Sequence, residues 1–249
     1  METTPQSSAS QKDVLILTCV HGDEQFANDP VYQLQKDYGD RFDWIIGNPQ
    51  AMQKNVRYIE VDLNRVAPGD PKGKEYEVRR AAELCEILQQ YHFVLDIHGT
   101  IAHCGIFTLI PNPSIHTLAL AAALPIENIV IWARQERKET KRGSLCYAHP
   151  CAVGIECGPK NAPEISEKLL AILRSIVRDG IQIQIASRLQ KRIFRVYGSL
   201  PDQADLPQLK DFQETQFNGE TFYPLLAAQY KGIACYKMQE VDLWEHFAY

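Results

Sequence analysis

The chain has 249 residues, of which 45% are hydrophobic and 23% are charged, and its 26 Lys and Arg against 31 Asp and Glu give a net charge of −5. This mixture is typical of a globular protein, and it lacks the basic excess that nucleic-acid-binding domains show. The longest apolar stretches, such as residues 118–124, are too short to cross a membrane. We therefore expect neither a nucleic acid nor a membrane as the partner of this chain.

The first residues and the cysteines indicate where the protein works. Residues 1–11 are polar and lack the charged and apolar regions of a signal peptide, so we expect a disordered tail. The seven Cys are an odd number and include no C-x-x-C pair. In a chain of this size, that pattern favours reduced thiols and a cytoplasmic location over a disulfide framework.

Residues 12–184 alternate between short apolar runs and amphipathic segments. Pro30 and Gly39 bracket the first helical segment, and Asp29 is its predicted cap. This alternation predicts an α/β sandwich around a mostly parallel or mixed sheet. In chain order, the predicted elements are a strand at 13–20, a helix at 30–38, a strand at 44–47 followed by a turn at 48–49, a loop at 66–74, a helix at 75–90, strands at 93–97, 106–110, 126–133 and 153–155, and a helix at 164–177.

The last part of the chain has a different pattern. Apolar segments at 193–197, 220–227 and 233–241 are separated by turns that contain Pro and Asp. We therefore predict a catalytic domain over residues 12–184 and a small β-rich domain over residues 185–249.

Three residues have the types and positions of metal ligands. His21 and His98 each follow an apolar strand, and Glu24 comes three residues after His21. Ligand-binding residues gather at the carboxyl ends of strands in α/β sheets, and two His with one Glu form the ligand set of many catalytic zinc sites. The alternatives are a turn residue for His21, a solvated acid at a helix start for Glu24, and a buried core histidine for His98. His103 is close enough in sequence to hydrogen-bond and orient His98 without binding the metal itself.

A further carboxylate and several cations complete the candidate site. Glu156 follows a short strand and precedes Gly158 and Pro159, so it is placed to act as a base or, alternatively, lies as an acid on the surface. A hydrolase that cleaves an amide beside a carboxylate needs cations for the oxyanion and for the carboxylate. The candidates are Arg57, Arg65 and Arg142, although each Arg taken alone also fits a surface position.

Four motifs together resemble one enzyme family. They are HGDE at 21–24, RYIEVDLNR at 57–65, DIH at 96–98 and VGIECGP at 153–159. In this order the chain resembles the aspartoacylase/succinylglutamate desuccinylase family of zinc-dependent N-acyl amino acid hydrolases. The resemblance implies a zinc carboxypeptidase-like α/β/α sandwich with a mixed sheet, followed by a small C-terminal β-rich domain.

The resemblance also implies catalytic roles. His21, Glu24 and His98 would hold one Zn²⁺ per chain, which lowers the pKa of a bound water. Glu156 would take the proton of that water, and Arg57 would stabilise the oxyanion.

The substrate side of the site follows the family motifs less closely. Asn64 and Arg65 would bind a substrate carboxylate, Arg142 would form a second clamp, and Tyr223 would contact the substrate from the C-terminal part. Tyr230 is the alternative to Tyr223. The C-terminal part is also shorter than in typical members of the family.

We therefore expect an aspartoacylase-like enzyme that converts N-acetyl-L-aspartate and water into acetate and aspartate, with a small N-acyl amino acid as its partner. Succinylglutamate desuccinylase, a related peptide amidase and a non-catalytic metal-binding protein are the alternatives. The sequence leaves open whether the chain forms a homo-oligomer.

Overall fold

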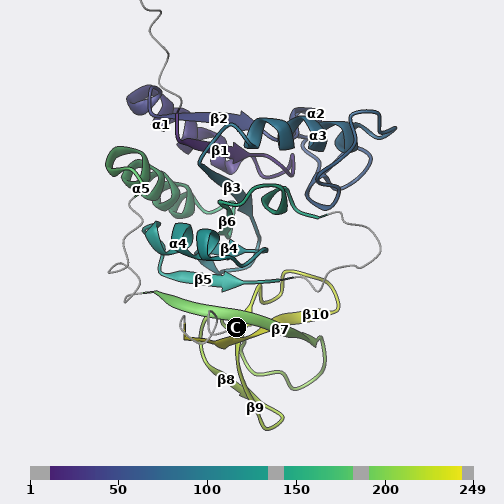
Figure 1. The fold of residues 1–249 in the computed structure, drawn as a ribbon. Helices are drawn as coiled ribbons and strands as arrows, with labels where there is room; N and C mark the ends of the chain where they lie inside the picture. Colours follow the sequence, from purple (N-terminus) through teal and green to yellow (C-terminus); the bar gives the residue numbers. More distant parts are fainter. Residues whose placement is uncertain (1–11, 134–142, 182–190, 243–249) are drawn as a thin grey trace, which may run out of the picture.

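The computed structural model describes residues 12–133, 143–181 and 191–242, and the described strands form one continuous mixed sheet (Figure 1). The sheet runs from β2 at the top of the figure to β8 at the bottom, in the order β2-β1-β3-β6-β4-β5-β7-β10-β9-β8. The strands are β1 Val14–Thr18, β2 Phe42–Ile46, β3 Phe93–Gly99, β4 Gly105–Ile110, β5 Asn128–Ile131, β6 Ala152–Gly158, β7 Arg192–Pro201, β8 Thr215–Phe217, β9 Glu220–Leu225 and β10 Ile233–Glu240. The helices are α1 Asn28–Tyr38, α2 Pro49–Lys54, α3 Tyr76–Leu88, α4 Ile115–Ala123 and α5 Pro163–Asp179, and short 3₁₀ turns lie at Gln25–Ala27, Leu63–Arg65 and Leu145–Ala148.

The strand direction reverses in the middle of the sheet. β2, β1, β3 and β6 are parallel to one another, whereas β4 is antiparallel to β6. At this reversal, Glu156 of β6 lies in register with His98 of β3 on one side and with Phe107 of β4 on the other. Paired residues of neighbouring strands point to the same face of a sheet, so His98 and Glu156 project on the same side.

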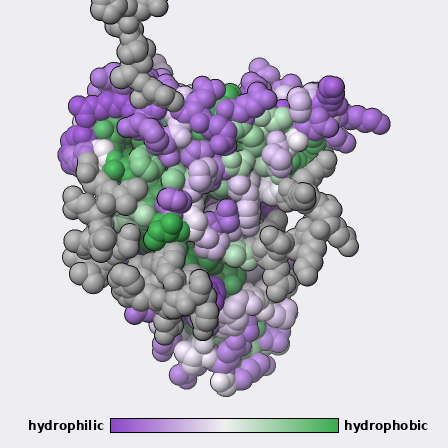
Figure 2. All heavy atoms as spheres, in the orientation of Figure 1, coloured by the Kyte–Doolittle hydropathy of each residue, from purple (hydrophilic) through white to green (hydrophobic). Residues whose placement is uncertain are grey.

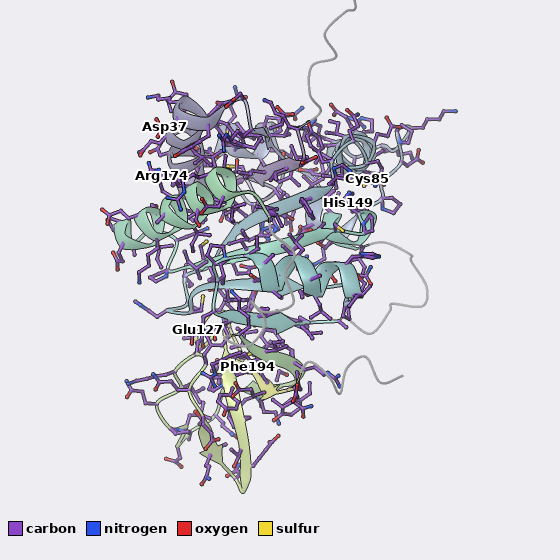
Figure 3. All side chains as sticks on the ribbon, turned by 60° about the vertical axis from the view of Figure 1, so that its left-hand side comes forward. Asp37, Cys85, Glu127, His149, Arg174 and Phe194 are labelled. Atoms are coloured by element: carbon purple, nitrogen blue, oxygen red, sulfur yellow. The ribbon has the colours of Figure 1, made fainter. Side chains whose placement is uncertain are left out.

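Alternation along the strands separates two faces. Leu95, Ile97 and Ile155 point to one face, where they form a core with α1, α4 and α5. Figure 3 shows α1 next to α5, with Asp37 and Arg174 beside each other at 3.7 Å.

The opposite face carries two separate apolar clusters. The first packs Leu15, Leu17 and Val94 against α3 and its flanking turns. The second lies toward the C-terminal strands and contains Phe107 and Phe194, among others. Asp96, His98, Gly154 and Glu156 project between these two clusters, which is where the pocket described below opens.

The C-terminal strands continue the main sheet. β7 pairs in parallel with β5, and β10, β9 and β8 follow in antiparallel order. A C-terminal β region is therefore present, as predicted, while the predicted boundary at 184/185 lies outside the described residues and stays a prediction. On the face drawn in Figure 2, hydrophilic side chains cover most of the top and bottom of the view, and hydrophobic side chains reach the surface mainly between them. None of the described helices is long and apolar enough to span a membrane.

The predicted strands and the three predicted helices are all present, but local details differ. Asn48 and Pro49 do not form a simple turn, because the Asn48 side chain accepts a hydrogen bond from the Ala51 N–H and Pro49 begins α2. The predicted Asp29 cap is wrong: α1 already begins at Asn28, and no side chain caps it. The sequence analysis also missed β8 and α4, although Ser114 and Thr117 form a capping box at the start of α4.

Candidate metal centre and active site

The three predicted metal ligands meet in one buried cluster. The Nδ1 atom of His21 lies 2.8 Å from Oε1 of Glu24, and the Nδ1 atom of His98 lies 3.2 Å from Oε2 of the same carboxylate. All three side chains are buried, and their candidate ligand atoms lie within 4.8 Å of one another. His21 and Glu24 both lie in the turn that follows β1, and His98 lies within β3.

A second carboxylate holds each imidazole from its far side. The Nε2 atom of His21 lies 3.2 Å from Oδ1 of Asp62, and the Nε2 atom of His98 lies 2.9 Å from Oδ2 of Asp96. Metal-bound histidines in proteins usually donate their other ring N–H to such a carboxylate, which fixes the tautomer. Two Nδ1 atoms and one carboxylate are a donor set that zinc accepts, with room for a further ligand.

The charges of the cluster also favour a cation. Burial alone would raise the pKa of Glu24, but the hydrogen bonds with His21 and His98 outweigh burial and hold this pKa well below its usual range. Burial lowers the pKa of His98, but the Asp96 and Glu24 carboxylates raise it well above its ordinary value. The cluster thus has an excess of negative charge whenever its imidazoles are neutral, and a divalent cation would neutralise that excess.

Glu156 is placed beside this cluster. It lies inside β6, in register with His98, and not after the end of a strand as the sequence predicts. Burial raises its pKa above the ordinary value, and the negative charge of Glu24 adds to this, against the opposing effect of His98. A raised carboxyl pKa moves toward the working pH of a general base.

Arg57 lies at the edge of the cluster. Its Nη2 and Nε atoms donate to Oδ2 of Asp62 at 3.2 and 3.3 Å, and its Nη1 atom lies 3.8 Å from Oε1 of Glu24. The side chain is 43% exposed, so the guanidinium faces the open side of the cluster.

Asn64 and Arg65 line the same pocket as Arg57. The Asn64 side chain is tied down, with its oxygen accepting from the Leu145 N–H at 3.1 Å and its nitrogen 3.3 Å from His98 Nε2. Arg65 donates to the backbone oxygen of Asn64 at 2.7 Å. These contacts connect the predicted carboxylate-binding pair directly to a candidate metal ligand.

The pocket has a volume of about 260 Å³, and it extends from the candidate metal ligands to an aromatic wall. Trp132 and Tyr236 pack edge to face at 4.4 Å between ring centres, and Tyr230 packs on Tyr236 at 5.9 Å. At this aromatic end, the pocket is lined by Leu109, Pro111, Trp132, Leu226, Gln229, Tyr230 and Tyr236.

The structure does not bring every predicted site residue into this pocket. Tyr223 lies on β9, where its ring packs on Phe194 and its hydroxyl donates to Glu214 at 3.3 Å, and it is not among the lining residues. Its alternative, Tyr230, does line the pocket. His103 is exposed and does not line the pocket, and Arg142 lies outside the described residues.

The sequence analysis missed two kinds of residue. Asp62 and Asp96 lie inside the quoted motifs, and Asp96 precedes His98 by two positions on a strand, so strand alternation was a usable signal for it. Trp132 and Tyr236 carried no such signal, because only the packing of β10 near β5 brings them together.

Comparison with known proteins agrees with these features. Residues 10–182 match the model of the succinylglutamate desuccinylase/aspartoacylase catalytic domain. The chain belongs to this family. A probable aspartoacylase from Prochlorococcus marinus (strain MIT 9515) is 31% identical over 180 residues, which are 66% of this chain and 60% of that protein. An aspartoacylase from Xenopus tropicalis is 28% identical over 155 residues, which are 55% of this chain and 49% of that protein. The matched part therefore spans less than two thirds of either relative.

Solved structures extend the likeness of the fold to almost the whole chain. Murine aminoacylase 3 matches with a TM-score of 0.70 at 22% identity, covering 93% of this chain and 96% of that one. The succinylglutamate desuccinylase from Chromobacterium violaceum matches with a TM-score of 0.66 at 18% identity, covering 94% and 86%. The predicted carboxypeptidase-like fold of this family, with a mixed sheet between helices and a C-terminal β region, is confirmed.

Proposed function

We propose that this protein is a zinc-dependent amidohydrolase that removes the acyl group from an N-acyl amino acid. N-acetyl-L-aspartate is the first candidate substrate, with acetate and aspartate as products. The proposal rests on one observation above all: the buried cluster of His21, Glu24 and His98 shares a pocket with Glu156, the register partner of His98. Membership of the family supports it.

Each residue of the site has a separate role in the proposed reaction. A zinc ion held by His21, Glu24 and His98 would supply Lewis-acid activation of water and of the scissile carbonyl. Glu156 accepts a proton from the attacking water while the oxygen of that water bonds to the acyl carbon. Arg57 donates to the oxyanion that develops on the carbonyl oxygen. When the C–N bond breaks, Glu156 returns the proton to the departing amine.

The substrate carboxylate would be held by the same end of the pocket. Arg65 is the proposed ion partner, and the backbone oxygen of Asn64 orients its guanidinium through the contact described above. Tyr230, not Tyr223, is the tyrosine that we propose beside the substrate, because only Tyr230 lines the pocket. Arg142 stays a candidate for the second clamp.

Replacement of the base tests this proposal. We expect Glu156→Gln to keep one zinc per chain but to lower turnover about 10³-fold, because the amide cannot accept the proton. Glu164→Gln, an exposed change at the start of α5, is the matched control and should keep full activity. Metal analysis and amino-acid release measure both effects, and near-normal turnover by the Glu156 variant would overturn the assignment.

A side-by-side assay of N-acetyl-L-aspartate and N-succinyl-L-glutamate tests the substrate. A clear preference for the acetyl compound supports the proposal as stated. A preference for the succinyl compound replaces it with the desuccinylase alternative, and activity on peptides alone replaces it with a peptide amidase.

A further inference from the structure

Gln229 joins two segments that are far apart in the chain. Its amide oxygen accepts hydrogen bonds from the Ile101 N–H at 2.9 Å, from the Ala102 N–H at 3.1 Å and from the hydroxyl of Thr100. One carbonyl oxygen thus receives three donors across the pocket. The Ala102 N–H also donates to the hydroxyl oxygen of Thr100 at 3.1 Å, so these groups form one small network around the Gln229 oxygen.

The segment that carries Gln229 is held in an unusual backbone conformation. Leu226 and Ala228 have φ values of +53° and +58°, in the left-handed region that residues with a Cβ seldom adopt. The Leu226 and Ala227 N–H groups donate to the carboxylate of Asp211 at 3.0 and 2.9 Å. Such conformations persist only where the surroundings over-determine them, and they are frequent at ligand-binding sites.

Both joined segments border the active site. Tyr230 follows Gln229, lines the pocket and packs on Tyr236. Partial burial raises the pKa of Tyr230, and the nearby charge of Glu156 adds to this effect. On the other side, Thr100 follows Gly99, whose N–H donates to Oε2 of Glu24 at 3.0 Å.

We propose that Gln229 is a positioning residue whose amide oxygen locks the Leu226–Tyr230 segment onto the Thr100–Ala102 turn and so holds Tyr230 at the substrate side of the pocket. The effect on catalysis rests on the proposed hydrolase function, whereas the lock itself does not. The role requires only an acceptor oxygen at this position. Two substitutions of similar size should therefore differ in effect: Gln229→Glu keeps an acceptor oxygen, whereas Gln229→Met has none.

Hydrogen–deuterium exchange of the zinc-loaded full chain tests the lock without any substrate. We expect Gln229→Met to speed exchange roughly tenfold at Ile101, whose N–H loses its acceptor, and at residues 226–232, whose segment loses its tether to the 100–102 turn and opens more often. Gln229→Glu should exchange like the wild type, and so should Gln239→Met, the same change at an exposed position of β10. Unchanged exchange in Gln229→Met, or loss of its zinc, would overturn the proposal.

Kinetics test whether the lock acts through Tyr230. On N-acetyl-L-aspartate and N-succinyl-L-glutamate, we expect Gln229→Met to raise KM roughly tenfold with a smaller change in kcat, and Gln229→Glu to restore KM. In a Tyr230→Ala background, Gln229→Met should have no further effect, because coupled residues are not additive. Additive losses would overturn a role through Tyr230. A wild-type enzyme inactive on both compounds would defeat the proposed function only, and the exchange experiment would still decide the lock.

Discussion

The two ends of the pocket are built in different ways. At the metal end, His21, Glu24 and His98 are buried, and each is fixed by a short turn or by strand register. At the aromatic end, Trp132 directly follows β5 and Tyr236 lies on β10, so they are far apart in the chain, and both are only partly buried. The contrast shows that backbone geometry alone places the metal end, whereas the aromatic end depends on how the C-terminal strands pack.

Because of this difference, we expect substitutions at the metal end to affect turnover and substitutions at the aromatic end to affect substrate affinity. Changes at the metal end remove the groups that we propose to hold the ion or to move the proton, so they should abolish turnover. Changes at the aromatic end should leave metal binding intact and alter substrate affinity, since that wall has no charged group among its lining residues within the described chain.

The largest effect is expected from His98→Ala. Loss of this ligand leaves only His21 and Glu24 of the cluster, so we expect the purified variant to lose its zinc and its activity to fall to background. Metal analysis after dialysis, with circular dichroism as a check of folding, measures this. His92→Ala is the control, because the His92 side chain is 75% exposed and its Nδ1 atom lies 2.8 Å from Oδ1 of Asp13. Stoichiometric zinc in the His98 variant would rule out this ligand.

Asp96→Asn should have a smaller effect at the same end. Asp96 contacts His98 at 2.9 Å on the side away from the candidate metal position, and loss of such a partner weakens metal binding about 10–100-fold. A zinc competition titration would measure the change. Asp37→Asn, on the exposed surface of α1, should leave zinc affinity at the wild-type value. Equal affinities for both variants would show that Asp96 does not support the metal ligand.

The contrast between the two ends also explains what the sequence could predict. The three-residue spacing from His21 to Glu24 is local in the chain, so the sequence could predict that these two side chains meet, whereas His98 joins them through the pairing of β1 with β3. Glu156 was recognisable from its motif, but its register with His98 was not, since β6 follows β3 only after two intervening strands. The choice between Tyr223 and Tyr230 could not be made, because it depends on the left-handed turn at 226–228 and on the contacts of Gln229.

Trp132→Leu tests the aromatic end. Its edge-to-face contact with Tyr236 at 4.4 Å is lost, so we expect about 1–3 kcal/mol of lost stability and a KM raised several-fold, with zinc content unchanged. Trp44→Leu is the matched control: Trp44 lies on the edge strand β2 and donates to Thr18 at 2.8 Å. It should lose stability without a change in KM. An unchanged KM in Trp132→Leu would show that the aromatic wall does not contribute to substrate binding.

The smallest effect is expected from His149, which should make the stability of the protein depend on pH. His149 lies on the side of the molecule that carries Cys85 of α3 (Figure 3), where its Nδ1 atom accepts from the Cys151 N–H at 3.1 Å and its Nε2 atom donates to the Tyr91 oxygen at 3.0 Å. This arrangement requires a neutral ring, since a proton on Nδ1 would remove the first bond.

Burial accordingly lowers the pKa of His149 below its ordinary value of 6.5. The unfolded chain then binds a proton more readily than the folded one, so the stability that this residue contributes is present above about pH 6.5 and is lost as the pH falls through its folded pKa. We expect His149→Gln to be less stable than the wild type at pH 7, with a gap in Tm that narrows toward pH 5, and to keep its turnover at pH 7. If the Tm of the wild type and of His149→Gln change in parallel between pH 7 and pH 5, His149 is not the group whose titration lowers the stability.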